Sequence, residues 1–206
     1  MMGLFPMFVR LEGRACLVVG GGSVAEGKIR SLLDAGANVR VVAPQANTII
    51  ATWTHDNLIT WEDREFEPAD LEGIFLVVSA TSSKEVNESV FQEARRRNVM
   101  CNVVDDPEHC DFYYPAVVRR GELQIAISTG GHSPALAQRL RKELEEQYGP
   151  EYAAWVNDLG RARQELFARD MDAEKRRVLL HELAALQPFA AVQPEQNRTG
   201  EGSDAR

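Results

Sequence analysis

A run of five apolar residues passes directly into three consecutive glycines and then into an amphipathic stretch. The run covers 15–19, the glycines are Gly20, Gly21 and Gly22, and the stretch continues through Leu33. A chain with this order makes a β-strand, a tight turn and an α-helix that packs back against the strand. This feature predicts an α/β protein built from β-α-β units.

The same turn has the features that bind the pyrophosphate of a dinucleotide. Gly20 allows a tight reversal, Gly22 lets a phosphate approach bare backbone, and Ala25 is small enough to replace the third glycine of the usual pattern. The N–H groups from Gly22 through Ser23, Val24 and Ala25 would face the phosphates at the positive end of the helix dipole. A turn without a ligand would use the same glycines, but the flanking strand and helix favour a nucleotide site.

Composition and charge narrow the class of protein. The chain has 206 residues with 44% hydrophobic and 26% charged residues, which is ordinary for a globular protein. A formal net charge of −8 argues against a nucleic-acid-binding protein. The three cysteines predict reduced thiols, and neither a signal peptide nor a membrane span of about 20 apolar residues is found. We therefore expect a cytoplasmic enzyme that binds neither nucleic acid nor membrane.

Strands and helices alternate over the first half of the chain, which predicts a Rossmann-like doubly wound parallel sheet. A different pattern follows, with a β-hairpin around Gly121 and then helices opened by Ser133 and Pro134. The predicted domains are a Rossmann-like nucleotide-binding domain at 1–111, a hairpin and helix at 112–149, a small C-terminal helical domain at 150–187 and a disordered tail at 188–206. The predicted strands are 15–19, 39–43, 58–61, 74–80, 99–104, 114–118 and 123–128, and the later helices are 84–97, 134–148, 151–169 and 172–186.

In an open α/β sheet, ligands bind outside the carboxyl ends of the strands. We therefore expect the glycine turn, the segment around Thr81 and the segment from Asn102 to Asp106 to meet at one crevice. Asp105 follows directly on an apolar strand at this edge, where a carboxylate can serve as an acid or base. The alternative is that Asp105 only begins the turn that ends the strand, and the spacing leaves both open.

A second glycine loop contains Ser128, Thr129 and Gly130, whose hydroxyls and amides could bind a carboxylate or phosphate. An ordinary loop before a serine-capped helix has the same sequence. Arg119 and Arg120 are expected to be exposed at the hairpin tip, although a ligand with several carboxylates would also require arginines. His109 and Cys110 are adjacent, which does not suit a tetrahedral zinc site, so we expect no bound metal.

One usual element of an NAD site is missing. The second strand should end in an acid about 20 residues beyond the glycines, where it would hold the ribose 2′-hydroxyl. The chain has Arg40 to Gln45 at this place, with no acid. The sequence alone therefore leaves NAD and NADP both open.

Taken together, these segments resemble the precorrin-2 dehydrogenase family, which includes the N-terminal module of siroheme synthase and sirohydrochlorin ferrochelatases. The resemblance covers about residues 4–150 well and the helical remainder more loosely. The matching segments run in one order along the chain: 4–8, 11–14, 18–25, 41–44, 80–81, 86–87, 102–107, 110–112, 114–116, 127–131 and 133–134.

The resemblance implies NAD-dependent oxidation of precorrin-2 to sirohydrochlorin in a homodimer whose subunit contact lies after residue 111. It implies that Asp105 is catalytic, that Ser23, Val24, Pro44 and Gln45 contact the nucleotide, and that Ser128 and Thr129 lie beside the tetrapyrrole. The missing acid then becomes a trait of the family. Some family members also insert ferrous iron into sirohydrochlorin, which the sequence leaves open, and the alternative function is a sensor that binds nucleotide or tetrapyrrole without turnover.

Overall fold

The computed structural model describes residues 3–186 and 188. It divides the chain into two compact units, Met1–Tyr114 and Pro115–Arg206, which are described separately below. In the part of the chain that is described, no helix combines the length and apolar character needed to cross a membrane.

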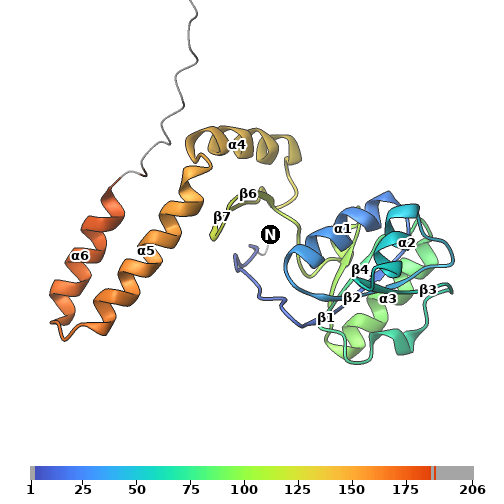
Figure 1. Cartoon of the computed structure of the whole chain (residues 1–206). Helices are drawn as coiled ribbons and strands as arrows, with labels where there is room; N and C mark the ends of the chain where they lie inside the picture. The colour runs from blue at the N-terminus through green and yellow to red at the C-terminus, as the bar shows by residue number, and fades with distance from the viewer. Residues whose placement is uncertain (1–2, 187, 189–206) are drawn as a thin grey trace, which may run out of the picture. The chain divides into compact units, whose positions relative to one another are not determined.

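The first unit is built on a parallel five-stranded sheet with the strand order β3-β2-β1-β4-β5 (Figure 1). The chain order reverses between β1 and β4, and this switch point is where doubly wound sheets bind their ligands. The predicted Rossmann-like sheet is thus confirmed. Its strands are β1 (Ala15–Val19), β2 (Asn38–Val42), β3 (Ile59–Glu62), β4 (Leu76–Ser79) and β5 (Met100–Val103).

Alternate residues of the strands supply two separate apolar layers. On β1, Cys16 and Val18 pack in the layer that includes α1 (Ser23–Asp34) and α2 (Thr48–His55). Leu17 and Val19 pack in the opposite layer with α3 (Lys84–Arg97). Burial of both faces explains why these strands are continuous apolar runs in the sequence.

Helix α2 was not expected from the sequence. Its residues include several β-branched side chains, which usually favour strands. Asn47 favours the helical conformation, because its side chain accepts a hydrogen bond of 2.9 Å from the N–H of Ile50 and caps the helix. Ile50 is then fully buried under the sheet. Two 3-10 turns, Pro68–Leu71 and Pro107–His109, were also not expected.

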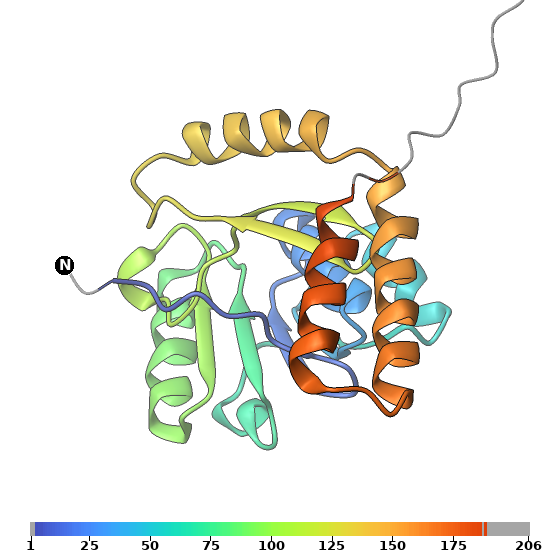
Figure 2. The same ribbon diagram turned by 90° about the vertical axis from the view of Figure 1, so that its left-hand side faces the viewer.

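The second unit contains the antiparallel hairpin of β6 (Ala116–Arg120) and β7 (Leu123–Ile127), as predicted. Helices α4 (Pro134–Gln147) and α5 (Glu151–Ala168) both contact the hairpin, and α6 (Ala173–Ala185) packs against α5 (Figure 2). Only three hydrophobic residues are buried in the described part of this unit, namely Val118, Ala137 and Leu166. The unit by itself therefore has a small core.

Arg120 corrects one expectation about the hairpin. Its guanidinium is not free at the tip but donates to the carbonyls of Tyr148 (2.8 Å) and Glu145 (3.0 Å) at the end of α4. These are carbonyls that a helix end leaves without partners, and a cation there also matches the helix dipole. Arg119 is exposed, as expected. The predicted domain boundaries stay predictions, and the tail from residue 189 lies outside the described residues.

Candidate active site at the carboxyl edge of the sheet

A cavity of about 610 Å³ opens at the carboxyl ends of the strands in the first unit. Segments that follow β1, β2, β4 and β5 all line it, so the predicted meeting of strand ends is found, with the β2 end added. Its lining residues are Gly20, Gly21, Gly22, Ser23, Val24, Ala43, Pro44, Gln45, Ala80, Thr81, Ser82, Val104 and Asp105.

Two residues expected to touch the cofactor do not line this cavity in the described part of the chain. Ala25 is fully buried under the sheet and serves the close packing of helix on strand. Asn102 is 7% exposed, and its amide donates to the carbonyl of Phe112 (2.8 Å) and to Cys110 Sγ (3.3 Å). This side chain ties the segment after β5 to the strand.

The three glycines have different surroundings. A Cβ on Gly20, whose φ is +118°, would lie 2.4 Å from the carbonyl oxygen of Ala80. A Cβ on Gly21 would lie 2.1 Å from the carbonyl oxygen of Gln45. A Cβ on Gly22 would meet no atom within 4 Å. The first two glycines therefore lock the turn between neighbouring loops, and the third faces open space.

The open space at Gly22 fits a dinucleotide pyrophosphate. Gly22 is the N-cap of α1, and a glycine cannot cap the helix with a side chain. The first N–H groups of a helix have no partner within the helix, so those of Ser23, Val24 and Ala25 are available to an anion, whereas the N–H of Glu26 donates to Gly22 O. If NAD binds here, bare backbone would therefore accommodate its pyrophosphate.

Pro44 and Gln45, which follow β2, line the same cavity. Arg40 is the cation closest in sequence to this strand end. It lies in the middle of β2 and donates to Glu62 (2.9 Å) and Asp70 (3.0 Å). Asp70 is 4% exposed and also binds Arg64, so these charges form a structural network. Arg40 is thereby committed to that network.

Asp105 lies on the rim of the cavity in a left-handed backbone conformation, with φ at +61°. This conformation is unfavourable for residues other than glycine, although Asp and Asn tolerate it best. Hydrogen bonds hold the turn on both sides: Val104 N donates to Ser79 O (2.9 Å), and Asp106 N donates to Val103 O (3.2 Å). The Asp105 side chain is exposed. The fixed backbone of the turn determines where it lies at the cavity.

Cys110 adds a further tie beneath this turn. Its Sγ lies 3.2 Å from Val103 O and 3.1 Å from Asp106 O, the carbonyls on either side of Asp105. Burial raises the pKa of the Cys110 thiol. The cysteine is thus a neutral structural group of this turn.

His109 contacts two acidic side chains next to this turn. Its Nδ1 lies 2.7 Å from Asp106 Oδ2 and its Nε2 lies 3.5 Å from Glu88 Oε2, while the ring packs edge-on against Phe91. The hydrogen bond to Asp106, aided by both nearby acids, raises the pKa of His109 above its ordinary value of 6.5.

We predict that His109→Gln lowers stability mainly at low pH. A raised pKa in the folded state stabilises the protein fully below pH 6.5, and the gain is lost as pH rises through the folded-state pKa. Thermal melting at pH 6 and pH 9 checks this: the Tm difference between wild type and variant should be larger at pH 6. Equal differences at both pH values would contradict it.

The loop predicted to bind substrate lies in the second unit. Ser128 Oγ accepts from Gly130 N (3.1 Å), and Thr129 Oγ1 accepts from Ser133 N (3.1 Å). Ser133 caps α4 by accepting from Leu136 N (3.2 Å). The hydroxyls therefore shape the loop first, and a role in substrate binding stays a prediction.

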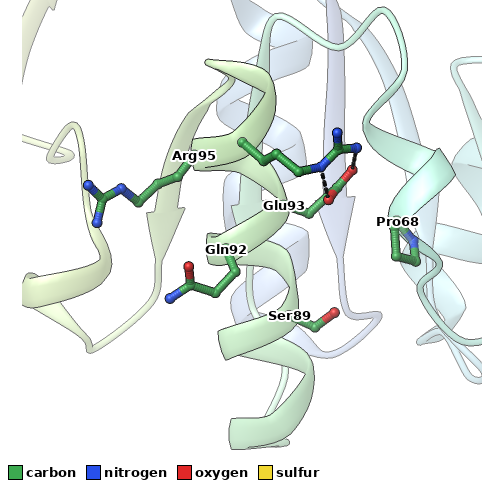
Figure 3. Close-up of a pocket in the computed structure, with 6 residues that line it drawn as sticks. Pro68, Ser89, Gln92, Glu93 and Arg95 are labelled. Atoms are coloured by element: carbon green, nitrogen blue, oxygen red, sulfur yellow. Dashed lines mark hydrogen bonds and ion pairs between the residues drawn. The ribbon is translucent and has the colours of Figure 1, made fainter.

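Another depression of similar size lies on the outer surface of α3 (Figure 3). In this depression Glu93 accepts two hydrogen bonds from Arg96, of 2.8 and 2.6 Å, while Arg95 points away from Glu93. Glu93 and Arg96 thus pair with each other on this helix. Among residues 3–186 and 188, no cluster of three or more metal-ligating side chains is found.

Comparison with known proteins agrees with this geometry. Residues 7–116 match a family model described as "Putative NAD(P)-binding", and residues 120–147 match one described as "Sirohaem biosynthesis protein central". A solved structure titled "SirC, precorrin-2 dehydrogenase" superposes with a TM-score of 0.76 at 28% identity, covering 87% of this chain and 89% of that one.

Curated relatives point to the same family. Siroheme synthase 1 of Aeromonas salmonicida is 46% identical over 144 residues, which is 70% of this chain and 31% of that protein. Siroheme synthase of Methylobacillus flagellatus is 37% identical over 205 residues, covering 100% of this chain and 43% of that protein. The chain thus spans about a third to two fifths of the length of these relatives. The chain belongs to the precorrin-2 dehydrogenase family of siroheme biosynthesis proteins.

Proposed function

We propose that this protein oxidises precorrin-2 to sirohydrochlorin with NAD as the electron acceptor. The observation that carries the proposal is the meeting of Asp105 with the glycine turn at one cavity. The solved structure with the matching fold is titled a precorrin-2 dehydrogenase, and the curated relatives are named siroheme synthases. Both names support this reaction.

In the proposed reaction the protein binds, orients and moves a proton. Bound NAD supplies the hydride acceptor. The backbone at Gly20, Gly22, Ser23 and Val24 holds the pyrophosphate of NAD. Three further residues contact the two ends of the nucleotide, namely Pro44, Gln45 and Thr81. One C–H bond of the substrate would break as its hydrogen passes with the electron pair to NAD, and a second substrate hydrogen would leave as a proton to Asp105, so two hydrogens are lost for each NADH formed.

The tetrapyrrole carries many carboxylates, and the second unit offers groups that suit them. We propose Ser128, Thr129 and Gly130 as contacts through hydroxyl and amide, and exposed Arg119 as an ion-pair partner. Ala25 and Asn102 contribute by packing and by holding the strand end.

Ferrous iron insertion into sirohydrochlorin would need only a base for the pyrrole protons, which Asp105 can provide, and iron is then a substrate.

We propose a cytoplasmic homodimer. The second unit buries few hydrophobic residues, and Phe5 and Phe8 near the N-terminus are 83% and 70% exposed. Exposed apolar surface of this kind marks a protein interface. Sedimentation equilibrium should give twice the chain mass, and a single-chain mass at all concentrations would contradict the dimer.

Incubation of the purified protein with precorrin-2 and NAD tests the reaction. NADH should form together with the absorbance of sirohydrochlorin, one NADH for each product molecule. Binding of NAD with no turnover would instead support a sensor. Ferrous iron added to preformed sirohydrochlorin tests the second activity separately, since that reaction consumes no NAD.

A further inference from the structure

The loop that follows β2, residues 43–47, lies in direct backbone contact with the glycine turn. The N–H of Asn47 donates to Gly21 O (2.9 Å). Gln45 O lies so close to Gly21 that a Cβ there would be only 2.1 Å away from it. Both segments also line the cavity, so their separation sets its width on this side.

The side chain of Asn47 adds a hydrogen bond from this loop to α1. Its Nδ2 donates to Glu26 Oε2 (2.9 Å), and its Oδ1 accepts from the N–H of Ile50 (2.9 Å). Glu26 lies in the first turn of α1, and its other carboxylate oxygen accepts from Arg30 (3.0 Å). Both the amide nitrogen and the amide oxygen of Asn47 are thus used.

The cap of α2 alone would not require an asparagine. Asp and Ser cap helices about as well as Asn, because each offers an oxygen to the free N–H groups. An ionised Asp has no donor, however, and Ser has a single polar atom, which the cap would occupy. The hydrogen bond from Asn47 to Glu26 is therefore a second task, which the side-chain amide of Asn47 performs in addition to the cap.

A second side-chain contact joins the same two helices one turn further along α1. The guanidinium of Arg30 lies over the ring of Trp53 in α2, 5.1 Å from the ring centroid. Of these two contacts, the hydrogen bond from Asn47 to Glu26 is the one that follows directly on the cavity-lining residues Pro44 and Gln45. Its loss would free this loop while leaving the other contact in place.

We propose that Asn47 is a positioning residue of the nucleotide site, whose side-chain amide holds the loop after β2 against the first turn of α1. The inference rests on the proposed function, because it concerns the placement of Pro44 and Gln45 relative to the glycine turn. In the described part of the chain, neither Asn47 nor Glu26 lines the cavity itself. A loop that is already held in its bound position loses less conformational freedom when the nucleotide binds, and this raises affinity.

An exchange of the two side chains tests the hydrogen bond directly. Asn47→Asp keeps an oxygen for the cap but places two carboxylates against each other, so NAD should bind about tenfold or more weakly. Adding Glu26→Gln should restore the affinity to within about threefold of wild type. In that double variant the new amide at position 26 can donate to the new carboxylate at position 47, and the net charge equals that of the wild type. Calorimetric titration with NAD measures each affinity without turnover.

Asn47→Ser removes only the donor and keeps the cap, so it should weaken NAD binding by about fivefold to tenfold. Asn38→Ser is the matched control. Asn38 begins β2 at the opposite edge of the sheet, where its Nδ2 donates to Gly13 O (3.2 Å). This variant loses a similar hydrogen bond in the same unit and should bind NAD as the wild type does.

Turnover separates positioning from a general loss of structure. The Asn47 variants should raise the KM for NAD, while kcat at saturating NAD stays within about twofold of wild type. Unchanged NAD affinity in Asn47→Asp, or a double variant as weak as Asn47→Asp, would overturn the proposal. A fall in kcat as large as the loss of affinity, together with a strongly lowered Tm, would also overturn it.

The proposed function fails in a different way. A wild-type protein that bound no NAD would remove both the dehydrogenase reaction and the role of Asn47. A wild type that binds NAD and oxidises precorrin-2, with equal affinities in the Asn47 variants, would remove only the role of Asn47.

Discussion

Gly21→Ala is expected to destabilise the protein and abolish NAD binding. The added methyl would lie 2.1 Å from the carbonyl oxygen of Gln45 and 2.8 Å from the Cα of Ala46, so two backbone segments must move apart. Overpacking of this kind costs about 3 kcal/mol. For a chain of this size that corresponds to a Tm lower by roughly 6 to 12 °C. Calorimetry of the variant measures the lower Tm, and titration with NAD measures the loss of binding.

Gly22→Ala is the matched control. Its added methyl meets no protein atom within 4 Å, so the Tm should stay within about 2 °C of wild type. NAD binding should nevertheless weaken by about tenfold or more, because the methyl occupies the approach of the pyrophosphate. If Gly22→Ala bound NAD as tightly as the wild type, the phosphate would lie elsewhere.

Asp105→Asn is expected to lower kcat by about 100-fold or more, the range in which a positioned base contributes. The amide fits the same left-handed turn, and the cavity keeps its shape, so the dissociation constant of NAD should change by less than about twofold. Stopped-flow recording of NADH formation from precorrin-2 gives kcat, and fluorescence titration gives the NAD affinity.

Asp106→Asn controls for a general loss of negative charge at this turn. Asp106 pairs with His109 and does not line the cavity in the described residues, so its variant should keep most of the wild-type kcat. Equal losses in both variants would assign the effect to the charge of the turn. Full activity in Asp105→Asn would remove the base from the proposal.

Local sequence carries most of the first unit. The strand, glycine turn and helix at 15–34 follow from the glycines and from apolar periodicity, and β4, α3 and β5 lie within a few residues of their predicted ranges. Helix α2 was not predicted because its β-branched residues do not favour a helix. The cap at Asn47 and the burial of Ile50 in the core together stabilise it. Arg120 was misassigned because the helix end that it caps is distant in sequence.

The site was predicted in outline because parallel strands bring their carboxyl ends together. What the sequence could not give is the geometry that depends on long-range contacts. The left-handed backbone of Asp105 and the tie from Cys110 depend on a turn closed by residues from β4 and beyond.

A crystal structure of the protein with NAD tests the central claim most directly. The pyrophosphate should lie against the N–H groups that begin α1 at Gly22, Ser23 and Val24, and the nicotinamide ring should lie on the side of the cavity lined by Asp105. A nucleotide bound at any other surface, or a nicotinamide ring turned away from Asp105, would contradict it.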